Sequence, residues 1–136
     1  MTVSFHAGRK SFEVGAASFF NSRFSTIYVR LENRRWGSRF SVLMNGLFPG
    51  TLSADLVPAA LQELHAVRNE FSGLPPEAMV WDYEDPSKQP PWGTERAAHI
   101  KTLAQYFVTS DGKDLFEVME KAFSSAISAG KDVVVA

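Results

Sequence analysis

The sequence contains no cysteine. This absence excludes disulfides, thiolate metal ligands and cysteine nucleophiles together. Long apolar runs are also missing: no stretch approaches the length of a membrane-spanning helix, and residues 1–10 lack the continuous apolar core of a signal peptide. We therefore expect a protein of the cytoplasm that has no membrane partner.

Catalytic and metal-binding patterns are absent from the histidines and the glycine-rich segments. His6, His65 and His99 lie far apart, and none has the spacing of a metal-binding pair such as His-Glu-x-x-His. No serine lies in Gly-x-Ser-x-Gly, and no glycine-rich loop precedes a Lys-Ser or Lys-Thr pair. These patterns predict neither an enzyme nor a bound cofactor.

Three carboxylates, Asp82, Glu84 and Asp85, form the one acidic cluster that could hold a divalent cation. An EF-hand loop needs regularly spaced oxygen ligands, a central glycine and a terminal glutamate, and Pro86 without such a glycine defeats that pattern. A metal-dependent hydrolase using these carboxylates is therefore only the weakest alternative. We expect no metal site.

The 136 residues fit one domain, 1–136, with a single core, and the charges are distributed unevenly along it. Residues 1–52 hold seven basic and two acidic residues, whereas residues 53–136 hold seven basic and thirteen acidic ones. Opposite charge on two parts of one domain indicates either internal ion pairing or two faces of opposite potential. Only the second arrangement steers a partner.

Apolar residues recur at helical spacing in four segments, residues 17–32, 36–47, 57–72 and 115–129. The second half of the first segment contains β-branched residues, so a strand is an alternative to the helix there. Ser38 is the expected N-cap of the second helix, Pro58 fits the first turn of the third, and Asp114 and Gly130 fit the two ends of the fourth. A brief helix is also expected over residues 95–104.

Short β-prone runs are predicted as strands over residues 3–7 and 11–14, joined by a turn at 8–10, and over residues 78–83. Residues 106–108 are β-prone as well, and the valine-rich residues 131–135 must pair inside a sheet. Helices and strands do not alternate regularly. The predicted class is therefore α+β, with about four helices packed on a small sheet that includes the C-terminal strand.

Residues 81–93, with the sequence Trp-Asp-Tyr-Glu-Asp-Pro-Ser-Lys-Gln-Pro-Pro-Trp-Gly, follow neither helical nor alternating periodicity. Prolines restrict the backbone, so we expect an ordered loop that loses little entropy on binding. Trp36 and Trp81 are expected to be core residues, and Trp92 a partly exposed anchor. The candidate binding residues of this loop are Asp82, Tyr83, Glu84, Asp85, Lys88 and Trp92.

The 81–93 segment, together with Arg35-Trp36-Gly37-Ser38-Arg39-Phe40 and the run from Tyr106-Phe107-Val108 to Asp114-Leu115-Phe116, resembles the immunity protein 70 family. This family occurs in bacterial polymorphic-toxin and contact-dependent growth inhibition systems. The resemblance extends from about Phe19 to the C-terminus. It implies a cytoplasmic antitoxin without catalytic activity, which forms a heterodimer with the C-terminal domain of a cognate toxin.

Two interpretations of the charged residues remain open. Several arginines lie near Trp36 in the sequence and could bind nucleic acid, so a small nucleic-acid-binding module is the main alternative function. These residues are Arg30, Arg34, Arg35 and Arg39. Because the whole chain is slightly acidic, pairing of these arginines with the acidic second half is favoured, and no nucleic-acid partner is expected. If the toxin is a nuclease, the acidic loop could instead occupy its basic cleft as a phosphate mimic.

Overall fold

The computed structural model describes residues 2–85 and 87–136, and over these residues four strands form one antiparallel sheet in the order β2-β1-β4-β3. β1 (Thr2–Ala7) and β2 (Lys10–Ala16) form the hairpin predicted around residues 8–10. β4 (Val133–Val135) lies between β1 and the short strand β3 (Thr51–Leu52). The prediction that the valine-rich C-terminal strand pairs inside a sheet is confirmed.

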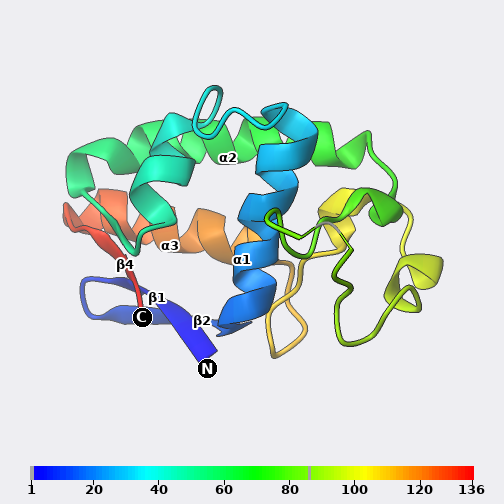
Figure 1. Ribbon diagram of the computed structural model, residues 1–136. Helices are drawn as coiled ribbons and strands as arrows, with labels where there is room; N and C mark the ends of the chain where they lie inside the picture. The colour runs from blue at the N-terminus through cyan, green and yellow to red at the C-terminus, as the bar shows by residue number, and fades with distance from the viewer. Residues whose placement is uncertain (1, 86) are drawn as a thin grey trace.

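The described helices pack on one face of this sheet. α2 (Val57–Ser72) and α3 (Leu115–Ala129) lie side by side, and α1 (Ala17–Thr26) crosses both (Figure 1). A short helix covers residues 41–47. α3 contacts α2 on one side and β1 and β2 on the other, so it forms the middle layer. The predicted α+β class with about four helices is confirmed for the described residues.

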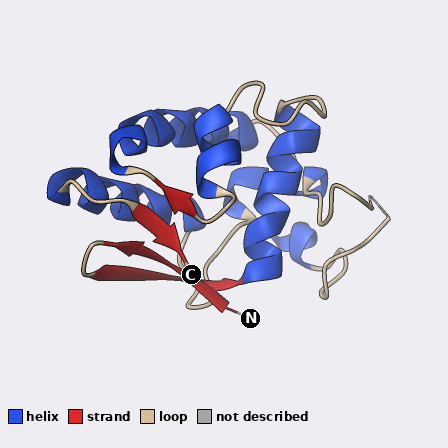
Figure 2. Ribbon diagram, turned by 60° about the vertical axis from the view of Figure 1, so that its left-hand side comes forward, coloured by secondary structure: helices blue, strands red, loops and turns tan. Residues whose placement is uncertain are grey.

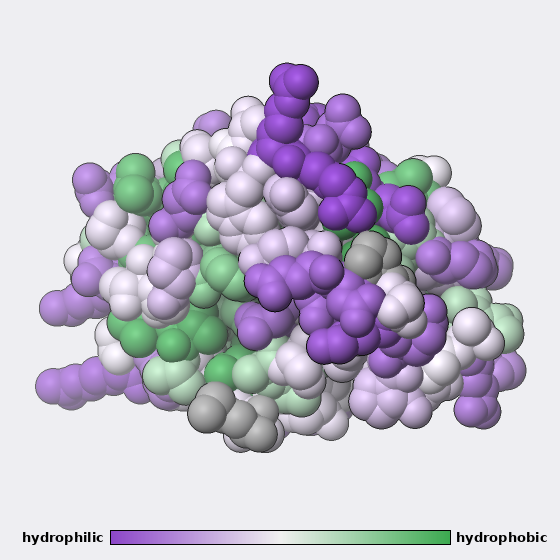
Figure 3. All heavy atoms as spheres, viewed as in Figure 1, coloured by the Kyte–Doolittle hydropathy of each residue, from purple (hydrophilic) through white to green (hydrophobic). Residues whose placement is uncertain are grey.

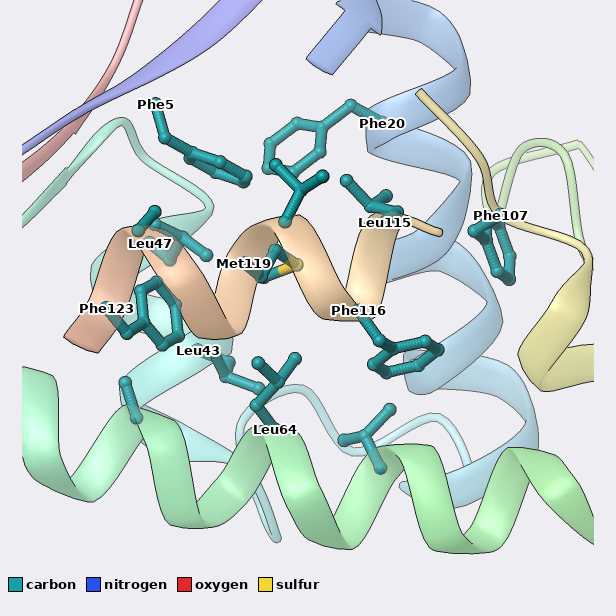
Figure 4. Close-up of a cluster of buried hydrophobic side chains, with 14 of the residues drawn as sticks. Phe5, Phe20, Leu43, Leu47, Leu64, Phe107, Leu115, Phe116, Met119 and Phe123 are labelled. Carbon is teal, nitrogen blue, oxygen red and sulfur yellow. The ribbon is translucent and has the colours of Figure 1, made fainter. Parts of the chain in front are cut away.

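The buried core surrounds α3 (Figure 4). Toward the sheet, Phe5 of β1 meets Phe20 of α1 edge to face, with ring centres 5.5 Å apart. Toward the other layer, Phe116 meets Phe71 of α2 edge to face at 5.9 Å. Because α3 is covered on both sides, it is apolar over much of its circumference. None of the described helices is long and apolar enough to cross a lipid bilayer.

Both ends of α3 and the start of α2 lie where local sequence signals predict them. The Phe116 N–H donates to the Asp114 carboxylate at 2.9 Å, and Gly130 ends α3 in the left-handed conformation with φ 64°. α2 begins at Val57, with Pro58 in its first turn, where a missing N–H needs no helical partner. α1 continues through a π-helical turn, Ile27–Leu31, so the strand alternative for this segment is excluded.

Residues 78–83 do not form the strand that the sequence predicts. A 3-10 turn covers Pro76–Ala78, and the extended chain after it pairs with side chains of α1. The Val80 N–H donates to the Thr26 hydroxyl at 3.0 Å, and the Tyr83 N–H donates to the Ser25 hydroxyl at 3.2 Å. Because helix side chains satisfy these donors, the segment needs no neighbouring strand.

The helix predicted over residues 36–47 begins only after a loop, and Ser38 is not its cap. Two carboxylates from other elements satisfy the backbone instead. Buried Glu32 accepts hydrogen bonds at 3.0–3.1 Å from the N–H groups of Gly37, Arg39 and Phe40. Glu63 of α2 accepts from the N–H groups of Val42 and Leu43. Such non-local capping leaves no signal in the helical periodicity.

The helix predicted over residues 95–104 is replaced by two 3-10 turns, Arg96–His99 and Leu103–Gln105. The chain between them is extended at Ile100 and Thr102, two β-branched residues that lose side-chain freedom in helices. The β-prone residues 106–108 contribute one isolated bridge, from Val108 to Asp114. The β-prone composition of residues 106–108 therefore does not lead to a full strand.

Candidate functional site

Hydrogen bonds hold the described part of the 81–93 loop against the rest of the molecule at both ends. Before the loop, Arg30 donates from Nε to the Ala78 carbonyl at 2.8 Å, and Ser25 then accepts from Tyr83. At the far end the indole N–H of Trp92 donates to the Tyr106 hydroxyl at 2.7 Å. The loop therefore has a defined shape although it forms neither helix nor strand.

Two of its carboxylates also stabilise this shape. Asp82 accepts a hydrogen bond from the Glu84 N–H at 2.9 Å and lies 3.4 Å from the Lys88 ammonium. Asp85 accepts from both the hydroxyl and the N–H of Ser87, and these hydrogen bonds hold the pKa of Asp85 below its usual range. Glu84 is exposed. The three acidic residues therefore differ: two order the loop, and one points to solvent.

Tyr83 lies on an aromatic cluster beside the π-helical turn that follows α1. Its ring centre is 5.1 Å from that of Tyr28 and 5.5 Å from that of Trp36. Trp36 donates from its indole N–H to the Met44 carbonyl at 3.2 Å, which fixes the ring. Desolvation, followed by the nearby Glu84 carboxylate, raises the pKa of Tyr83. The phenol is therefore neutral at physiological pH and acts as an apolar surface with a hydroxyl.

On the opposite side of the loop, a groove of about 590 Å3 opens against the start of α1. Phe19 forms its centre, in edge-to-face contact with Trp92 at 5.0 Å and stacked on Trp81 at 6.3 Å. Arg96 lines the groove and donates twice to the Tyr106 carbonyl. Burial lowers the pKa of Arg96. The groove is mostly apolar, with the guanidinium of Arg96 and the carboxylate of Glu95 in its wall.

The six predicted binding residues thus lie on one loop but face two directions. Tyr83 faces the Trp36 cluster, Trp92 faces the groove, and the four charged residues lie between them; these are Asp82, Glu84, Asp85 and Lys88. Trp36 and Trp81 are half-buried, whereas the sequence predicts core residues at both positions; Trp36 still packs against the core, and Trp81 does not. Trp92 is also half-buried and packs directly on the core.

Phe19, Tyr28 and Arg96 complete these surfaces, and sequence reasoning missed them. Tyr28 belongs to the apolar stripe of the first helix and Phe19 directly precedes that stripe, so nothing in the sequence separates them from core residues. Arg96 stands in no motif. Their position beside the loop comes from contacts between segments that are distant along the chain.

The arginines near Trp36 do not form one continuous basic surface. Arg39 forms a two-pronged ion pair with Glu70 of α2, at 2.6 and 2.8 Å, and this pairing with the acidic second half was favoured from the sequence. Arg30, which is anchored on the Ala78 carbonyl, and Arg34 line one small pocket that does not include Arg39. No group of three or more potential ligands that could hold a metal ion is found among the described residues.

Comparison with known families decides the classification. The family model described as immunity protein 70 matches residues 5–135, nearly the whole chain. The chain belongs to the immunity protein 70 family. Membership implies an immunity protein whose partner is a cognate toxin. The match begins closer to the N-terminus than the resemblance of the motifs alone indicates. No curated protein and no solved structure matches the chain.

The three segments on which the family resemblance rests meet around α1 in this immunity protein. Trp36, from the first segment, contacts Tyr83 of the second. Trp92, also from the second, bonds to Tyr106 of the third, and Phe19 of α1 lies against both rings. Residues that are scattered in the sequence therefore build one continuous region.

Proposed function

We propose that this protein binds the C-terminal domain of one cognate toxin, from a contact-dependent growth inhibition or polymorphic toxin system, and neutralises it in the cytoplasm as a heterodimer. Membership of the immunity protein 70 family over residues 5–135 carries this proposal. The protein acts by binding and performs no catalysis.

The proposed toxin-binding surface is the 81–93 loop with the residues that it contacts. Trp81, Tyr83 and Trp92 are each half-buried, so each keeps an exposed part that a partner can cover. Tryptophan, tyrosine and arginine are the residues most enriched among the energetic anchors of protein interfaces. The loop projects from the side of the molecule away from the sheet, which leaves it open to a large partner (Figure 2).

We further propose that the toxin is a nuclease. Hydrophilic side chains gather on the face in front of α1 (Figure 3), and the loop adds three carboxylates there, two of them held in fixed positions. Carboxylates in a rigid array suit the basic cleft of a nuclease, where they take the place of phosphate groups and accelerate association. Lys88 is paired with Asp82, so it belongs to the loop structure as well as to the proposed contact.

Co-expression tests the function directly. The toxin domain encoded beside this gene should arrest growth when expressed alone, and this protein should restore growth and form a complex with a Kd on the order of 1 nM or tighter. Undiminished toxicity, with no complex on a sizing column, would refute the proposal. Digestion of DNA or RNA by the isolated toxin domain tests the nuclease assignment.

The acidic loop is tested most cleanly at Glu84, because Asp82 and Asp85 also hold the loop together. Glu84→Gln should slow association with the toxin and flatten its dependence on salt, without changing the melting temperature. Asp55→Asn, an exposed carboxylate on the turn before α2, is the control and should leave association unchanged. Equal association rates for both variants would place the electrostatic contact elsewhere.

A further inference from the structure

A polar pocket of about 360 Å3 lies between the end of the α1 helical segment and the two ends of the aromatic loop. Three basic side chains line it, Arg30, Arg34 and Lys88, together with a single carboxylate, that of Glu77. Its walls are the residues around Val80 and Pro90. The pocket is distinct from the aromatic groove, although Trp81 borders both.

Arg30 and Arg34 lack the ion pairs that occupy the neighbouring cations. Within the described residues, Arg39 pairs with Glu70 and Lys88 pairs with Asp82, whereas no carboxylate lies within ion-pair distance of Arg30 or Arg34. Arg30 uses its Nε on the Ala78 carbonyl, which fixes the guanidinium plane. Its two terminal nitrogens make no hydrogen bond to the described residues, so their N–H groups remain available to a ligand.

The backbone at Arg34, beside the pocket, has an unfavourable left-handed conformation. Asn33 and Arg34 both have positive φ, 51° and 61°, and the Arg34 N–H donates to the Tyr28 carbonyl at 2.9 Å. Asparagine tolerates this left-handed region, but arginine is strained there by on the order of 1 kcal/mol. Glycine is the residue that fits without strain. The turn itself therefore gives no reason for an arginine at this position.

We propose that this pocket receives a single carboxylate, an aspartate or glutamate side chain of the toxin domain; this inference rests on the proposed function. Two unpaired guanidinium groups suit the two oxygens of a carboxylate, because their N–H donors form parallel hydrogen bonds. A nucleic-acid strand is the poorer occupant: it needs a positive track, and the pocket is bordered by Glu77 and by the acidic loop.

The pocket and the acidic loop together give the interface both signs of charge. The loop carboxylates attract a basic toxin surface, and the pocket accepts one acidic group at a fixed position. A toxin with the wrong arrangement then meets like charge or leaves the arginines unpaired, which selects the cognate partner. The pocket residue therefore sets specificity and the docking register.

Arg34→Gly is the decisive variant, with Asn33→Gly as its matched control. Both replace a left-handed residue by glycine, but only the first removes a charge from the pocket. Arg34→Gly should weaken toxin binding ~10-fold or more without lowering the melting temperature, because glycine relieves the strain. Asn33→Gly should leave toxin affinity unchanged. Equal loss of affinity in both variants would assign the effect to the backbone and overturn the proposal.

A charge exchange identifies the toxin group. Arg34→Glu should abolish tight binding, and changing surface aspartates and glutamates of the toxin to arginine one at a time should restore it at one position. Failure of every exchange would overturn the inference. So would an Arg34→Gly protein that keeps full toxin affinity but loses affinity for a single-stranded oligonucleotide. If the wild-type protein binds no toxin, the proposed function itself fails, which is a different result.

Discussion

The hydroxyl of Thr26 accepts a hydrogen bond from the Val80 N–H at 3.0 Å and donates one to the Ser22 carbonyl at 2.8 Å within α1. One helix side chain thus anchors the chain that enters the aromatic loop. Both groups are buried, so the bond to Val80 cannot be exchanged for one to water without moving the segment.

Thr26→Val keeps the shape of the side chain and removes its hydroxyl. The Val80 N–H is then buried without a partner, and the free energy of unfolding should fall by about 1–3 kcal/mol in a urea titration. Thr26→Ser keeps the hydroxyl and should lose less. If Thr26→Val is as stable as the wild type, the anchoring bond contributes nothing.

The two tryptophans of the loop should contribute differently to the free energy of unfolding. Trp92 packs on the core and bonds to Tyr106, whereas Trp81 covers Phe19 from outside the core. Trp92→Ala should therefore reduce the free energy of unfolding more than Trp81→Ala, by up to about 3 kcal/mol. Trp92→Phe keeps an aromatic ring but removes the N–H, so it distinguishes the contribution of ring packing from that of the hydrogen bond to Tyr106. A larger loss for Trp81→Ala than for Trp92→Ala would contradict this order.

Arg23 of α1 is fully buried, and one of its terminal nitrogens has no hydrogen-bond partner among the described residues. Its guanidinium lies 3.9 Å from the centre of the Phe116 ring and contacts the Met119 sulfur. Desolvation lowers the pKa of Arg23 to about 9, so the group is still charged at neutral pH.

Arg23→Met fills the same space without a charge and should leave the free energy of unfolding unchanged or raise it by about 1–2 kcal/mol. Arg23→Ala leaves a cavity and should lower it by about 2–4 kcal/mol. Thermal or urea unfolding of the two variants distinguishes charge from packing. If methionine destabilises as much as alanine, the contacts of the guanidinium with Phe116 and Met119 outweigh its desolvation.

Glu32 organises the loop before the short helix by accepting three backbone hydrogen bonds. Glu32→Gln replaces one acceptor oxygen by a donor amide and removes the charge that strengthens these bonds. The free energy of unfolding should fall by about 2 kcal/mol. Glu63→Gln makes the same change at the helix start and is the comparison. If Glu32→Gln leaves the free energy of unfolding unchanged, the loop does not depend on this carboxylate.

The hydrogen bonds from Ser87 make the order of the loop pH-dependent. They lower the pKa of Asp85, so their contribution is present at neutral pH and is lost as the pH falls through that lowered pKa. Ser87→Ala should move the titration of the Asp85 carboxyl carbon, followed by NMR, to higher pH. Asp111, whose pKa is lowered chiefly by Thr109, is the internal control and should titrate unchanged. An unchanged Asp85 titration would exclude this cause.

Helical periodicity predicts α2 and α3 well because each buries its own repeating stripe, and Pro58 and Asp114 mark their starts locally. The same periodicity fails where backbone N–H groups donate to side chains that are distant along the chain. The 78–83 segment has the composition of a strand, yet Thr26 and Ser25 satisfy it from a helix. The start of the 41–47 helix depends likewise on Glu63 of α2.

The candidate site shows the same division. Composition alone draws attention to residues 81–93, because aromatic and charged side chains in an ordered loop favour binding. It cannot tell that Tyr83 and Trp92 face different surfaces, since that depends on how the loop lies across α1. The pocket of Arg30 and Arg34 needs the fold as well, because Lys88 reaches it from a distant segment.

The pairing of β1 with β4 joins two strands that lie far apart along the chain. Its register joins Phe5 to Val135, so the two strands meet only when a loop of nearly the whole described chain closes. The entropy of closure rises with loop length, and contacts between distant segments slow folding. Pairing of β4 with β1 is therefore expected to be a late step in the folding of this sheet.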